Sequence, residues 1–448
     1  MINGLLTLRG AWDKVRTDPV LKFMVVAITG YGMATFEGPM LSIKSVNAVA
    51  HFTDWIIAHV HVGALAWNGF LTFGMIYYLV PRLFKTKLYS VGLANLHFWI
   101  GTLGIIMYAL PLYVAGFTQY SLWQQFNPDG TLAYGNFLET VTEIMPMYWM
   151  RAIGGTLFIT GMLILIYNVI VTIINGSKVE DELAEAPALQ NVSKRRTAGE
   201  GWHTWLERKP IKLTIYATVA ILIGGIVQIV PTLLVKSNIP TISSVKPYSP
   251  LELEGRDIYI REGCVGCHSQ MVRPFRSEVE RYGEYSKAGE FVYDHPFLWG
   301  SKRTGPDLHR VGSKYSDSWH LNHMYDPQST SPGSIMPAYQ WLVKSRLDKS
   351  NTEGKMKAMV TLGVPYSDED IANAQANMDA QGAKIQENLH QDPDFAKSYA
   401  SDKKYAEDNG QDFIEMKDRE IVALISYLQR LGTDIKVKDV QKQLSAKN

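Results

Sequence analysis

Five long apolar runs constrain this chain more than any other feature of its sequence. An α-helix needs about 20 mostly apolar residues to cross the hydrocarbon core of a bilayer, and each of these runs is long enough. All of them lie in the first part of the chain, whereas the rest is polar and charged. The sequence therefore predicts a mostly α-helical protein with a membrane part followed by a soluble part. The expected spans are residues 21–42, 55–80, 91–116, 147–174 and 213–235.

The basic residues of the connecting loops predict the orientation of these helices. Lys and Arg are frequent in the cytoplasmic loops of membrane proteins and scarce in the opposite loops. Basic side chains gather before the first run, after the second, and between the fourth and fifth, whereas residues 118–149 contain neither Lys nor Arg. We therefore expect a multi-pass protein of the bacterial inner membrane whose soluble C-terminal part lies in the periplasm.

The stretch between the fourth and fifth apolar runs divides the membrane part in two. Residues 177–203 are rich in Glu, Ala, Ser and Lys and contain no long apolar run, which is typical of a linker. Its basic residues favour a cytoplasmic location. The predicted organisation is four membrane helices in 1–176, a cytoplasmic linker in 177–212, a membrane anchor in 213–236 and a periplasmic domain in 237–448.

The two cysteines of the chain stand together in the sequence Cys264-Val-Gly-Cys267-His268. C-x-x-C-H is the attachment sequence of c-type heme, in which both thiols form thioethers and the histidine binds the iron. Zinc is the main alternative, but a zinc site needs four ligands and usually a second pair of cysteines. The predicted periplasmic location agrees with heme c, which is attached on that side of the membrane. We therefore predict one covalent heme c with His268 as its first axial ligand.

The second axial ligand of this heme must come from further along the chain. A His/Met pair raises the potential of a heme iron, as an electron carrier requires. Met336, in Ser-Ile-Met336-Pro-Ala-Tyr, lies well past His268, whereas Met271 is too close in sequence to reach the far face of the ring. The alternative role for Met336 is packing in the core. We predict Met336 as the sixth ligand.

Two segments that flank the heme motif have the apolar spacing of helices, residues 251–261 and 416–431. We expect them to cross beside the heme, as in small class I cytochromes c, with residues 305–308 over the heme edge. The charged stretches 277–294 and 345–411 are interpreted as insertions on that core. The other histidines of this domain lack partners for a separate metal site, and most are expected on the surface or in loops: His295, His309, His320, His323 and His390.

The second membrane span contains two histidines, His59 and His61, near its outer end. An imidazole inside a bilayer is costly and needs a partner. Residues two apart on an α-helix are separated by about 200° around its axis, so the two rings cannot share one metal. One metal on each side of the helix is the simplest use, and Gly63, Ala64 and Ala66 would leave room for flat macrocycles. The alternative is that both rings hydrogen-bond to neighbouring helices.

Other polar side chains lie in or beside the predicted spans. Tyr31 and Glu37 share one helix, and a buried carboxyl group there is typical either of a proton relay or of a helix end. Arg151 lies at an outer helix end, where it could meet heme propionates or anchor the helix at the interface. His97 is interpreted as packed and hydrogen-bonded, with no ligand role, and His51 receives no role.

Several of these motifs resemble one enzyme family. Residues 53–61, TDWIIAHVH, resemble the heme-ligand helix of heme-copper oxidases. Residues 3–14, NGLLTLRGAWDK, and 36–39, FEGP, narrow the resemblance to the catalytic subunit I of cbb3-type cytochrome c oxidase. From His203 onward the chain is similar to the monoheme cytochrome c subunit II of that enzyme. The motifs that carry this second resemblance are CHSQMVRP at 267–274, WGSKRTGPD at 299–307 and MPAY at 336–339.

The resemblance covers nearly the whole chain and implies a role for each candidate residue. It implies that the two subunits are fused, with the C-terminal four helices of subunit I in residues 1–176. His59 would bind the iron of heme b3 and His61 the iron of heme b. The implied heme c ligands are Cys264 and Cys267 as thioethers and His268 and Met336 on the iron, and Glu37 and Tyr31 match positions implied in proton delivery.

The resemblance also implies a function. The chain would belong to a terminal oxidase in which electrons pass from a donor cytochrome c through heme c and heme b to the heme b3/copper site. There O2 would be reduced to water with proton translocation. The implied partners are other oxidase subunits, including a diheme cytochrome c subunit, and membrane lipid. With a formal net charge of +1 and no basic arm, no nucleic-acid partner is expected.

One departure from the family limits that implication. The family's catalytic subunit has many more spans, and the histidines that hold copper B, the second axial histidine of heme b and a cross-linked tyrosine all lie upstream of the matched region. His51 and His97 do not match those positions. We therefore expect that this chain alone does not reduce O2, and that it is either a truncated gene or one half of a split subunit. The alternatives are a membrane-anchored c-type electron carrier without its own catalytic centre, a non-functional fragment and, least favoured, a nitric oxide reductase.

Overall fold

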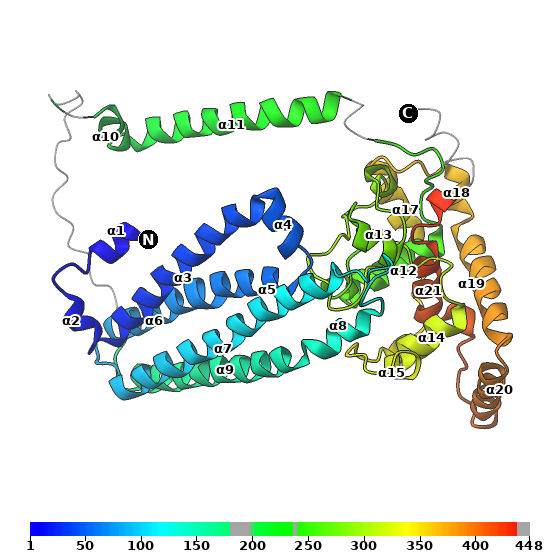
Figure 1. Cartoon of the computed structure of the whole chain (residues 1–448), viewed down its shortest axis with the longest axis horizontal. Helices are drawn as coiled ribbons and strands as arrows, with labels where there is room; N and C mark the ends of the chain where they lie inside the picture. The colour runs from blue at the N-terminus through cyan, green and yellow to red at the C-terminus, as the bar shows by residue number, and fades with distance from the viewer. Residues whose placement is uncertain (180–198, 200, 236–239, 437–448) are drawn as a thin grey trace. The chain divides into compact units, whose positions relative to one another are not determined.

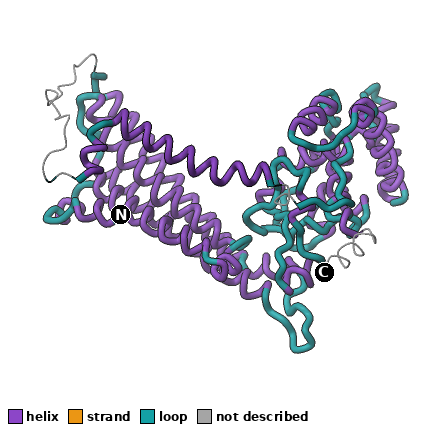
Figure 2. Tube along the Cα trace, turned by 90° about the horizontal axis from the view of Figure 1, so that it is seen from above, coloured by secondary structure: helices purple, strands orange, loops and turns teal. Residues whose placement is uncertain are grey.

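The computed structural model describes residues 1–179, 199, 201–235 and 240–436, and it is built from helices (Figure 1). No strand occurs among these residues, which Figure 2 shows as helices joined by loops. The chain forms two compact units, one made of Met1–Lys178 with Ser243–Asn448 and the other of Val179–Ile242. The predicted fold class, a mostly α-helical membrane protein, is confirmed.

The four predicted spans of residues 1–176 are present as long helices. The first is α3 (Pro19–Ser42), which starts where the Asp18 side chain accepts a hydrogen bond from the backbone N–H of Val20 at 2.8 Å. Proline is tolerated at the first position of this helix, because a backbone N–H there would have no partner within the helix. The other spans are Asp54–Leu83, α7 (Val91–Trp123) and α9 (Met145–Ile174). Short helices flank them: α1 (Ile2–Leu6), α2 (Trp12–Val15), α4 (Lys44–Ala50) and α8 (Phe137–Glu143).

The second span changes its helical type in the middle. It consists of α5 (Asp54–His61), the π-helical segment η1 (Val62–Gly69) and α6 (Phe70–Leu83). π-Helical turns are rare and occur frequently at functional sites. Here the wider turns begin directly after the histidine pair.

The third span is longer than its apolar run, because α7 continues to Trp123 instead of ending at residue 116. Gln119 explains the difference. Its side chain accepts from the backbone N–H of Asp54 at 2.7 Å and donates to the Asp54 carboxyl group at 2.9 Å. A polar residue with a buried partner lets the helix continue beyond the apolar pattern.

The core of this bundle forms between α3, α6, α7 and α9. Phe23, Phe70 and Phe98 meet at its centre, with ring centroids 4.9–6.1 Å apart. Helices α7 and α9 approach closely because glycines face each other. A Cβ on Gly104 would lie 2.8 Å from the carbonyl oxygen of Gly154, so a larger residue would separate the two helices.

The unit Val179–Ile242 contains α10 (Trp202–Glu207) and α11 (Pro210–Leu234), and α11 is the fifth helix long and apolar enough to span a membrane. All five predicted spans are therefore confirmed as helices of sufficient length and hydropathy. Much of the predicted linker, residues 180–198 and 200, lies outside the described residues. The domain boundaries at 176, 212 and 236 stay predictions.

The soluble part of the first unit is organised around the crossing of α12 (Pro250–Arg261) and α21 (Glu420–Arg430). A Cβ on Gly255 would lie 1.9 Å from the carbonyl oxygen of Ala423, so the two backbones touch at this point. The sequence prediction began the second helix at residue 416. That boundary was wrong, because Met416–Asp418 form a separate 3-10 turn and Arg419 is extended.

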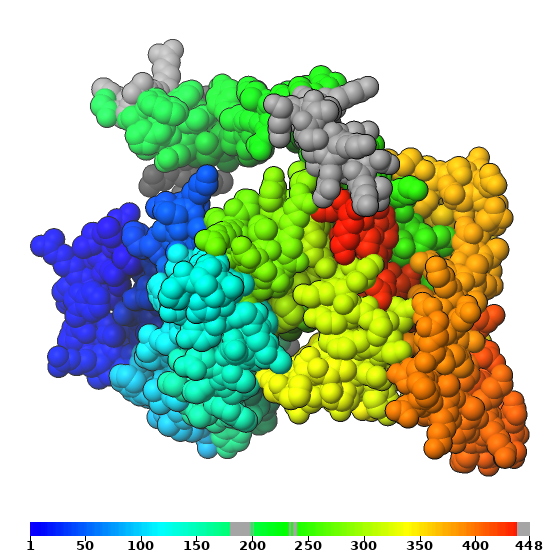
Figure 3. Space-filling view, turned by 45° about the vertical axis from the view of Figure 1, so that its right-hand side comes forward, coloured from blue at the N-terminus to red at the C-terminus, as the bar shows by residue number. Residues whose placement is uncertain are grey.

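The stretch predicted as an insertion at 345–411 takes part in the main core. Met378, Leu389 and Tyr399 belong to the same buried cluster as α21. The elements involved are α17 (Thr352–Thr361), α18 (Asp368–Ala372), α19 (Ala374–His390) and α20 (Pro393–Asp408). Figure 3 shows α19 and α20, in orange, as an outer face of the soluble part. The remaining elements are α13 (Arg276–Tyr282), the 3-10 turn η4 (Ala288–Phe291), α14 (Asp317–Tyr325), α15 (Pro327–Thr330) and α16 (Gln340–Lys344).

Candidate heme sites

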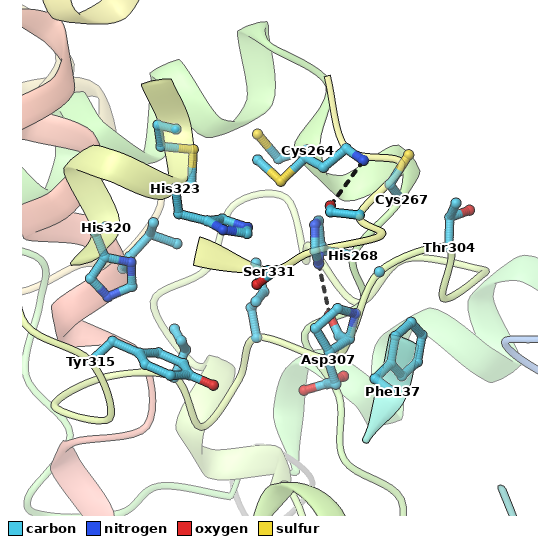
Figure 4. Close-up of a pocket in the computed structure, with 18 of the residues that line it drawn as sticks. Phe137, Cys264, Cys267, His268, Thr304, Asp307, Tyr315, His320, His323 and Ser331 are labelled. Atoms are coloured by element: carbon cyan, nitrogen blue, oxygen red, sulfur yellow. Dashed lines mark hydrogen bonds between the residues drawn. The ribbon is translucent and has the colours of Figure 1, made fainter. Parts of the chain in front are cut away.

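A cavity of about 420 Å³ in the soluble part brings the predicted heme c residues together. Cys264, Cys267 and His268 lie together at this cavity (Figure 4). Met336, from the loop that follows α15, lines it as well. Helix α12 ends at Arg261, and Gly263 follows it with a φ of 72°, in the left-handed region that glycine adopts without strain. The chain then turns through the 3-10 segment Cys264–Gly266, which places both thiols and the following imidazole on the cavity.

The ring of His268 is held in one orientation. Its Nδ1–H donates to the carbonyl oxygen of Pro306 at 2.8 Å, which leaves Nε2 as the nitrogen with a free lone pair. Burial lowers the pKa of His268, so the ring is neutral at pH 7, as a metal ligand must be. Gly305 lies against the ring, and a Cβ there would come within 2.2 Å of the His268 Cε1 atom. The chain at residues 305–306 therefore both orients the imidazole and leaves space for it.

The two cysteines differ in their surroundings, although both are free thiols. Burial, followed by the nearby carboxylate of Glu262, raises the pKa of Cys264 to about 12. Cys267 is exposed. Neither thiol is close enough to His, Cys, Asp or Glu partners to form a metal cluster, because the described residues contain no group of three or more such side chains that could hold a metal ion. This arrangement fits covalent attachment better than zinc.

Met336 also lines the cavity, from a loop without regular secondary structure. Two hydrogen bonds position this loop. The N–H of Met336 donates to the Ser334 hydroxyl at 3.2 Å, and the N–H of Tyr339 donates to the carbonyl oxygen of Met324 at 2.7 Å. Met271 is not among the residues that line the cavity, and its N–H donates to the Asp307 carboxylate at 2.8 Å.

Helix α14 contributes a wall that the sequence reasoning missed. His320 and His323 were expected on the surface or in loops, but both lie on this helix and line the cavity. Their expected exposure is wrong because α14 turns one face inward, with Trp319 and Met324 on the same wall. Burial, and then His268, lowers the pKa of His323 to about 4. The i, i+3, i+4 spacing of these aromatic and apolar residues was the signal in the sequence.

The other histidines of the soluble part lie away from the cavity wall. His309 is buried, 5% exposed, also against expectation, because its ring packs on Phe291 at a centroid distance of 4.6 Å. His295 is half-buried in a loop and His390 is exposed at the end of α19.

A buried charge network lies beneath the heme motif. The guanidinium of Arg303 donates to the Ser269 hydroxyl at 2.8 Å and pairs with Glu278 at 2.9 Å. The Asp307 carboxylate accepts from Ser269 at 2.5 Å. Buried charges persist only when paired and hydrogen-bonded, and these groups satisfy one another. The network therefore fixes the segment that follows His268.

This network also meets the chain segment that precedes the membrane histidines. The backbone N–H of Arg303 donates to the carbonyl oxygen of Phe52 at 2.8 Å, and its guanidinium lies 4.2 Å from the centre of the Phe52 ring. Phe52 has a φ of 69°, which is a strained conformation for a non-glycine residue. Such strain persists only where the surroundings over-determine it. The loop that leads into α5 is thus held against the soluble part.

His59 and His61 face different helices of the membrane part. The Nδ1 atom of His59 lies 3.1 Å from the Oε2 atom of Glu37 on α3. The Nδ1–H of His61 donates to the carbonyl oxygen of Ile57 at 2.7 Å, and its Nε2 accepts from the Tyr108 hydroxyl of α7 at 3.1 Å. The two rings therefore point in different directions. Their use as iron ligands stays a prediction.

The two rings are not equally ready to bind iron. His59 uses Nδ1 for its contact with Glu37, which leaves Nε2 for a metal. His61 already uses both nitrogens, so coordination through Nε2 requires that the Tyr108 hydroxyl moves away. The residues thus fit a heme at His59 directly and one at His61 only after this rearrangement.

The remaining polar residues have well-defined partners. Besides His59, the Glu37 carboxyl group accepts from Trp55 Nε1 at 2.5 Å and from the Tyr113 hydroxyl at 2.7 Å. Tyr31, on the same helix, packs on Trp67 with ring centroids 4.7 Å apart.

Arg151, His97 and His51 also have partners. Arg151 donates from Nε to the Tyr108 hydroxyl at 3.1 Å. His97 is fully buried and its Nδ1 lies 3.1 Å from the Tyr77 hydroxyl, as predicted for a packed, hydrogen-bonded residue. His51 packs on Phe52, and burial, followed by two nearby arginines, lowers its pKa to about 4.

Comparison with known families divides the chain in two. Residues 203–435 match the family model described as "Cytochrome C oxidase, mono-heme subunit/FixO", and residues 1–157 match "Cytochrome C and Quinol oxidase polypeptide I". The residues between the two matches, 158–202, comprise the end of α9 and most of the stretch predicted as a linker.

Individual relatives match the first part of the chain. "Cytochrome c oxidase subunit 1 homolog" of Agrobacterium tumefaciens (strain T37) is 54% identical over 192 residues, which are 42% of this chain and 35% of that protein. "Cbb3-type cytochrome c oxidase subunit CcoN1" of Stutzerimonas stutzeri is 48% identical over 169 residues, 38% of this chain and 35% of that protein. A nitric oxide reductase chain of the same organism is 28% identical over 149 residues, 32% of this chain and 30% of that protein. The chain spans about a third of the length of these relatives.

Proposed function

Because this chain belongs to the cytochrome c oxidase mono-heme subunit (FixO) family and begins with a segment of oxidase subunit I, we propose that it is an electron-transferring component of a terminal respiratory oxidase of the cbb3 type. The observation that carries this proposal is the cavity in which Cys264, Cys267, His268 and Met336 meet. When bound, heme c supplies a one-electron carrier in this cavity.

The residues of the cavity have separate tasks in this proposal. Cys264 and Cys267 attach the macrocycle through thioethers. His268 binds the iron through Nε2, because the Pro306 carbonyl oxygen holds its Nδ1–H. Met336 would supply the second ligand of the iron, and its thioether would raise the potential.

In the membrane part we assign His59 to the iron of heme b3 and His61 to that of heme b. Glu37 orients the His59 ring from the side opposite to the metal, as carboxylates commonly do for metal-bound histidines. Its position inside a membrane span also supports the proposed part in proton delivery, together with Tyr31. The contact between Arg303 and Phe52 supports electron transfer from the heme c side toward α5.

The oxidase activity itself is proposed for a complex. Electrons would enter from a donor cytochrome c and pass through heme c and heme b to the heme b3/copper site, where O2 is reduced to water with proton translocation. The copper B ligands would come from outside the described residues, which contain no group of three or more His, Cys, Asp or Glu side chains that could hold a metal ion. Proposed partners are other oxidase subunits, including a diheme cytochrome c subunit, and lipids of the bacterial inner membrane, with the domain of residues 237–448 in the periplasm.

Heme staining after denaturing electrophoresis tests this proposal on the full chain, co-expressed with the c-heme maturation machinery. The wild-type chain should carry covalent heme, and Cys264→Ala/Cys267→Ala should carry none. His59→Ala/His61→Ala should keep the stained band, while b-type absorption of the assembled complex disappears. His203→Ala, a replacement at an exposed histidine of α10, is the matched control and should change neither signal. A stained band that persists without the cysteines would refute the heme c site.

A second function is favoured by one observation. Because residues 203–435 match a mono-heme cytochrome c family and Cys264, Cys267, His268 and Met336 line one cavity, the second candidate is a membrane-anchored c-type electron carrier without a catalytic centre. Oxygen consumption separates the two. If the complex is an oxidase, replacing His59 abolishes its oxygen consumption. If the chain is only a carrier, its electron transfer depends on Cys264, Cys267 and His268 and does not change when His59 is replaced.

A further inference from the structure

The wall of the heme c cavity opposite His268 contains a second side chain with the properties of an iron ligand. His323 lies on α14, lines the cavity, and Figure 4 shows its ring directed toward His268. Met336, the proposed sixth ligand, lines the same cavity. Two donor atoms of different chemistry, a thioether and an imidazole, therefore border the space that the heme would fill.

Hydrogen bonding determines which nitrogen of His323 is free. The Thr330 hydroxyl donates to the carbonyl oxygen of Pro327 at 3.3 Å, which uses its single proton. Thr330 must then accept from the His323 Nδ1–H, which lies 2.6 Å from its oxygen. In this arrangement the proton of His323 is on Nδ1, so Nε2 keeps an available lone pair.

His268 shows the same arrangement on the other side of the cavity. Its Nδ1–H donates to a carbonyl oxygen and its Nε2 is free. A hydrogen bond at one ring nitrogen commonly fixes the tautomer and orientation of a metal-bound histidine. His320 differs, because its Nε2 is buried without any hydrogen-bond partner.

Packing restricts the ring plane of His323 as well. Trp319 stacks on it with a centroid distance of 4.5 Å and an interplanar angle of 11°. Tyr315 stacks in turn on Trp319, at 4.0 Å and 15°. His323 is thus fixed on a helix by a hydrogen bond and a stack, whereas Met336 belongs to a loop without regular structure.

We propose that His323 is a reserve ligand of the heme c iron, which binds through Nε2 when the bond to Met336 is lost. This inference rests on the proposed heme c site. In the exchange the iron–sulfur bond breaks and an iron–nitrogen bond forms, and no proton or electron is gained or lost because Nε2 carries no proton. His/His ligation removes the thioether that raises the potential, so the exchanged site is a weaker electron acceptor.

The test uses the full chain, matured with covalent heme and purified in detergent, and records difference spectra of each variant against the wild type so that other hemes cancel. Met336→Ala should remain six-coordinate and low-spin, without the sulfur-to-iron charge-transfer band and with a lower midpoint potential. Met336→Ala/His323→Phe keeps an aromatic ring against Trp319 but cannot bind iron, and it should be high-spin. Met336→Ala/His320→Phe is the matched control and should behave as Met336→Ala alone.

Two further measurements keep the result interpretable. Added imidazole should restore the low-spin spectrum of Met336→Ala/His323→Phe, which shows that the cavity is folded. Thr330→Val should weaken the low-spin signal of Met336→Ala, because Nδ1 loses its acceptor. If Met336→Ala is already high-spin, or stays low-spin without His323, the reserve ligand is disproved. Loss of covalent heme from the wild-type chain would instead disprove the heme c site itself.

Discussion

The cavity of the soluble part and the membrane histidine pair each contain a histidine, but the two rings differ in whether Nε2 is available to bind a metal. The Nδ1–H of His268 donates to the carbonyl oxygen of Pro306, its Nε2 is free, and the thiols of Cys264 and Cys267 come from the same chain segment as the ring. His61 also has its Nδ1–H on a carbonyl oxygen, but its Nε2 accepts from the Tyr108 hydroxyl. The comparison teaches that a C-x-x-C-H segment can bring both thiols and a free imidazole nitrogen to one cavity, whereas the Nε2 of His61 depends on a side chain of another helix.

The largest expected effect concerns the space beside the His268 ring in the soluble part. Gly305→Ala would place a Cβ within 2.2 Å of the His268 ring, and such overpacking costs about 1–3 kcal/mol or more. We expect covalent heme per chain to fall by roughly tenfold, which corresponds to about 1.4 kcal/mol. Heme absorbance relative to protein measures it.

Gly266→Ala is the matched control for this prediction. A Cβ on Gly266 would meet nothing within 4 Å, although this glycine lies in the heme motif between Cys264 and Cys267. Equal heme content in both variants would mean that space at Gly305 does not matter for the site.

An intermediate effect is expected at the membrane pair. Glu37→Gln keeps the shape of the side chain but makes the contact with His59 a neutral one, and a hydrogen bond to a charged group exceeds a neutral one by about 1 kcal/mol. We expect a lower affinity of the assembled complex for the heme at His59, with heme c unchanged. Pyridine hemochrome ratios of b-type to c-type heme measure this difference.

Tyr113→Phe serves as the comparison for that variant, because it removes another partner of the same carboxyl group without touching His59. If both variants lose b-type heme equally, Glu37 acts through packing of the bundle and not through the ring of His59.

The smallest effect concerns acid stability of the soluble part. Burial, and then Arg310, holds the pKa of His309 well below its usual range. Below about pH 6.5 the unfolded chain therefore binds a proton that the folded chain does not, and stability falls by up to about 1.4 kcal/mol per pH unit until the folded pKa is reached. Denaturant unfolding at pH 7 and pH 5.5 should show this loss.

His309→Gln should reduce the acid sensitivity, because glutamine does not titrate. His390→Gln, at an exposed histidine, should leave the pH dependence as it is in the wild type. A wild-type chain whose stability is equal at both pH values would contradict the prediction.

Residues 53–61 show how much could be predicted from the sequence. The apolar runs predicted all five spans, because bilayer thickness sets the length of a spanning helix whatever its neighbours. The spacing of His59 and His61 predicted rings that point in different directions, since helix geometry is local. The partners of those rings, Glu37 and Tyr108, come from other helices and could not be predicted.

The sequence by itself determined the class of this protein, because the heme attachment motif and the membrane spans are each contiguous in the chain. The tertiary structure decided what surrounds them. It brought His323 and Met336 to the same cavity as Cys264 and His268, and it placed Phe52 against Arg303. These contacts join residues far apart in the chain, and packing between helices, which no local pattern encodes, determines them.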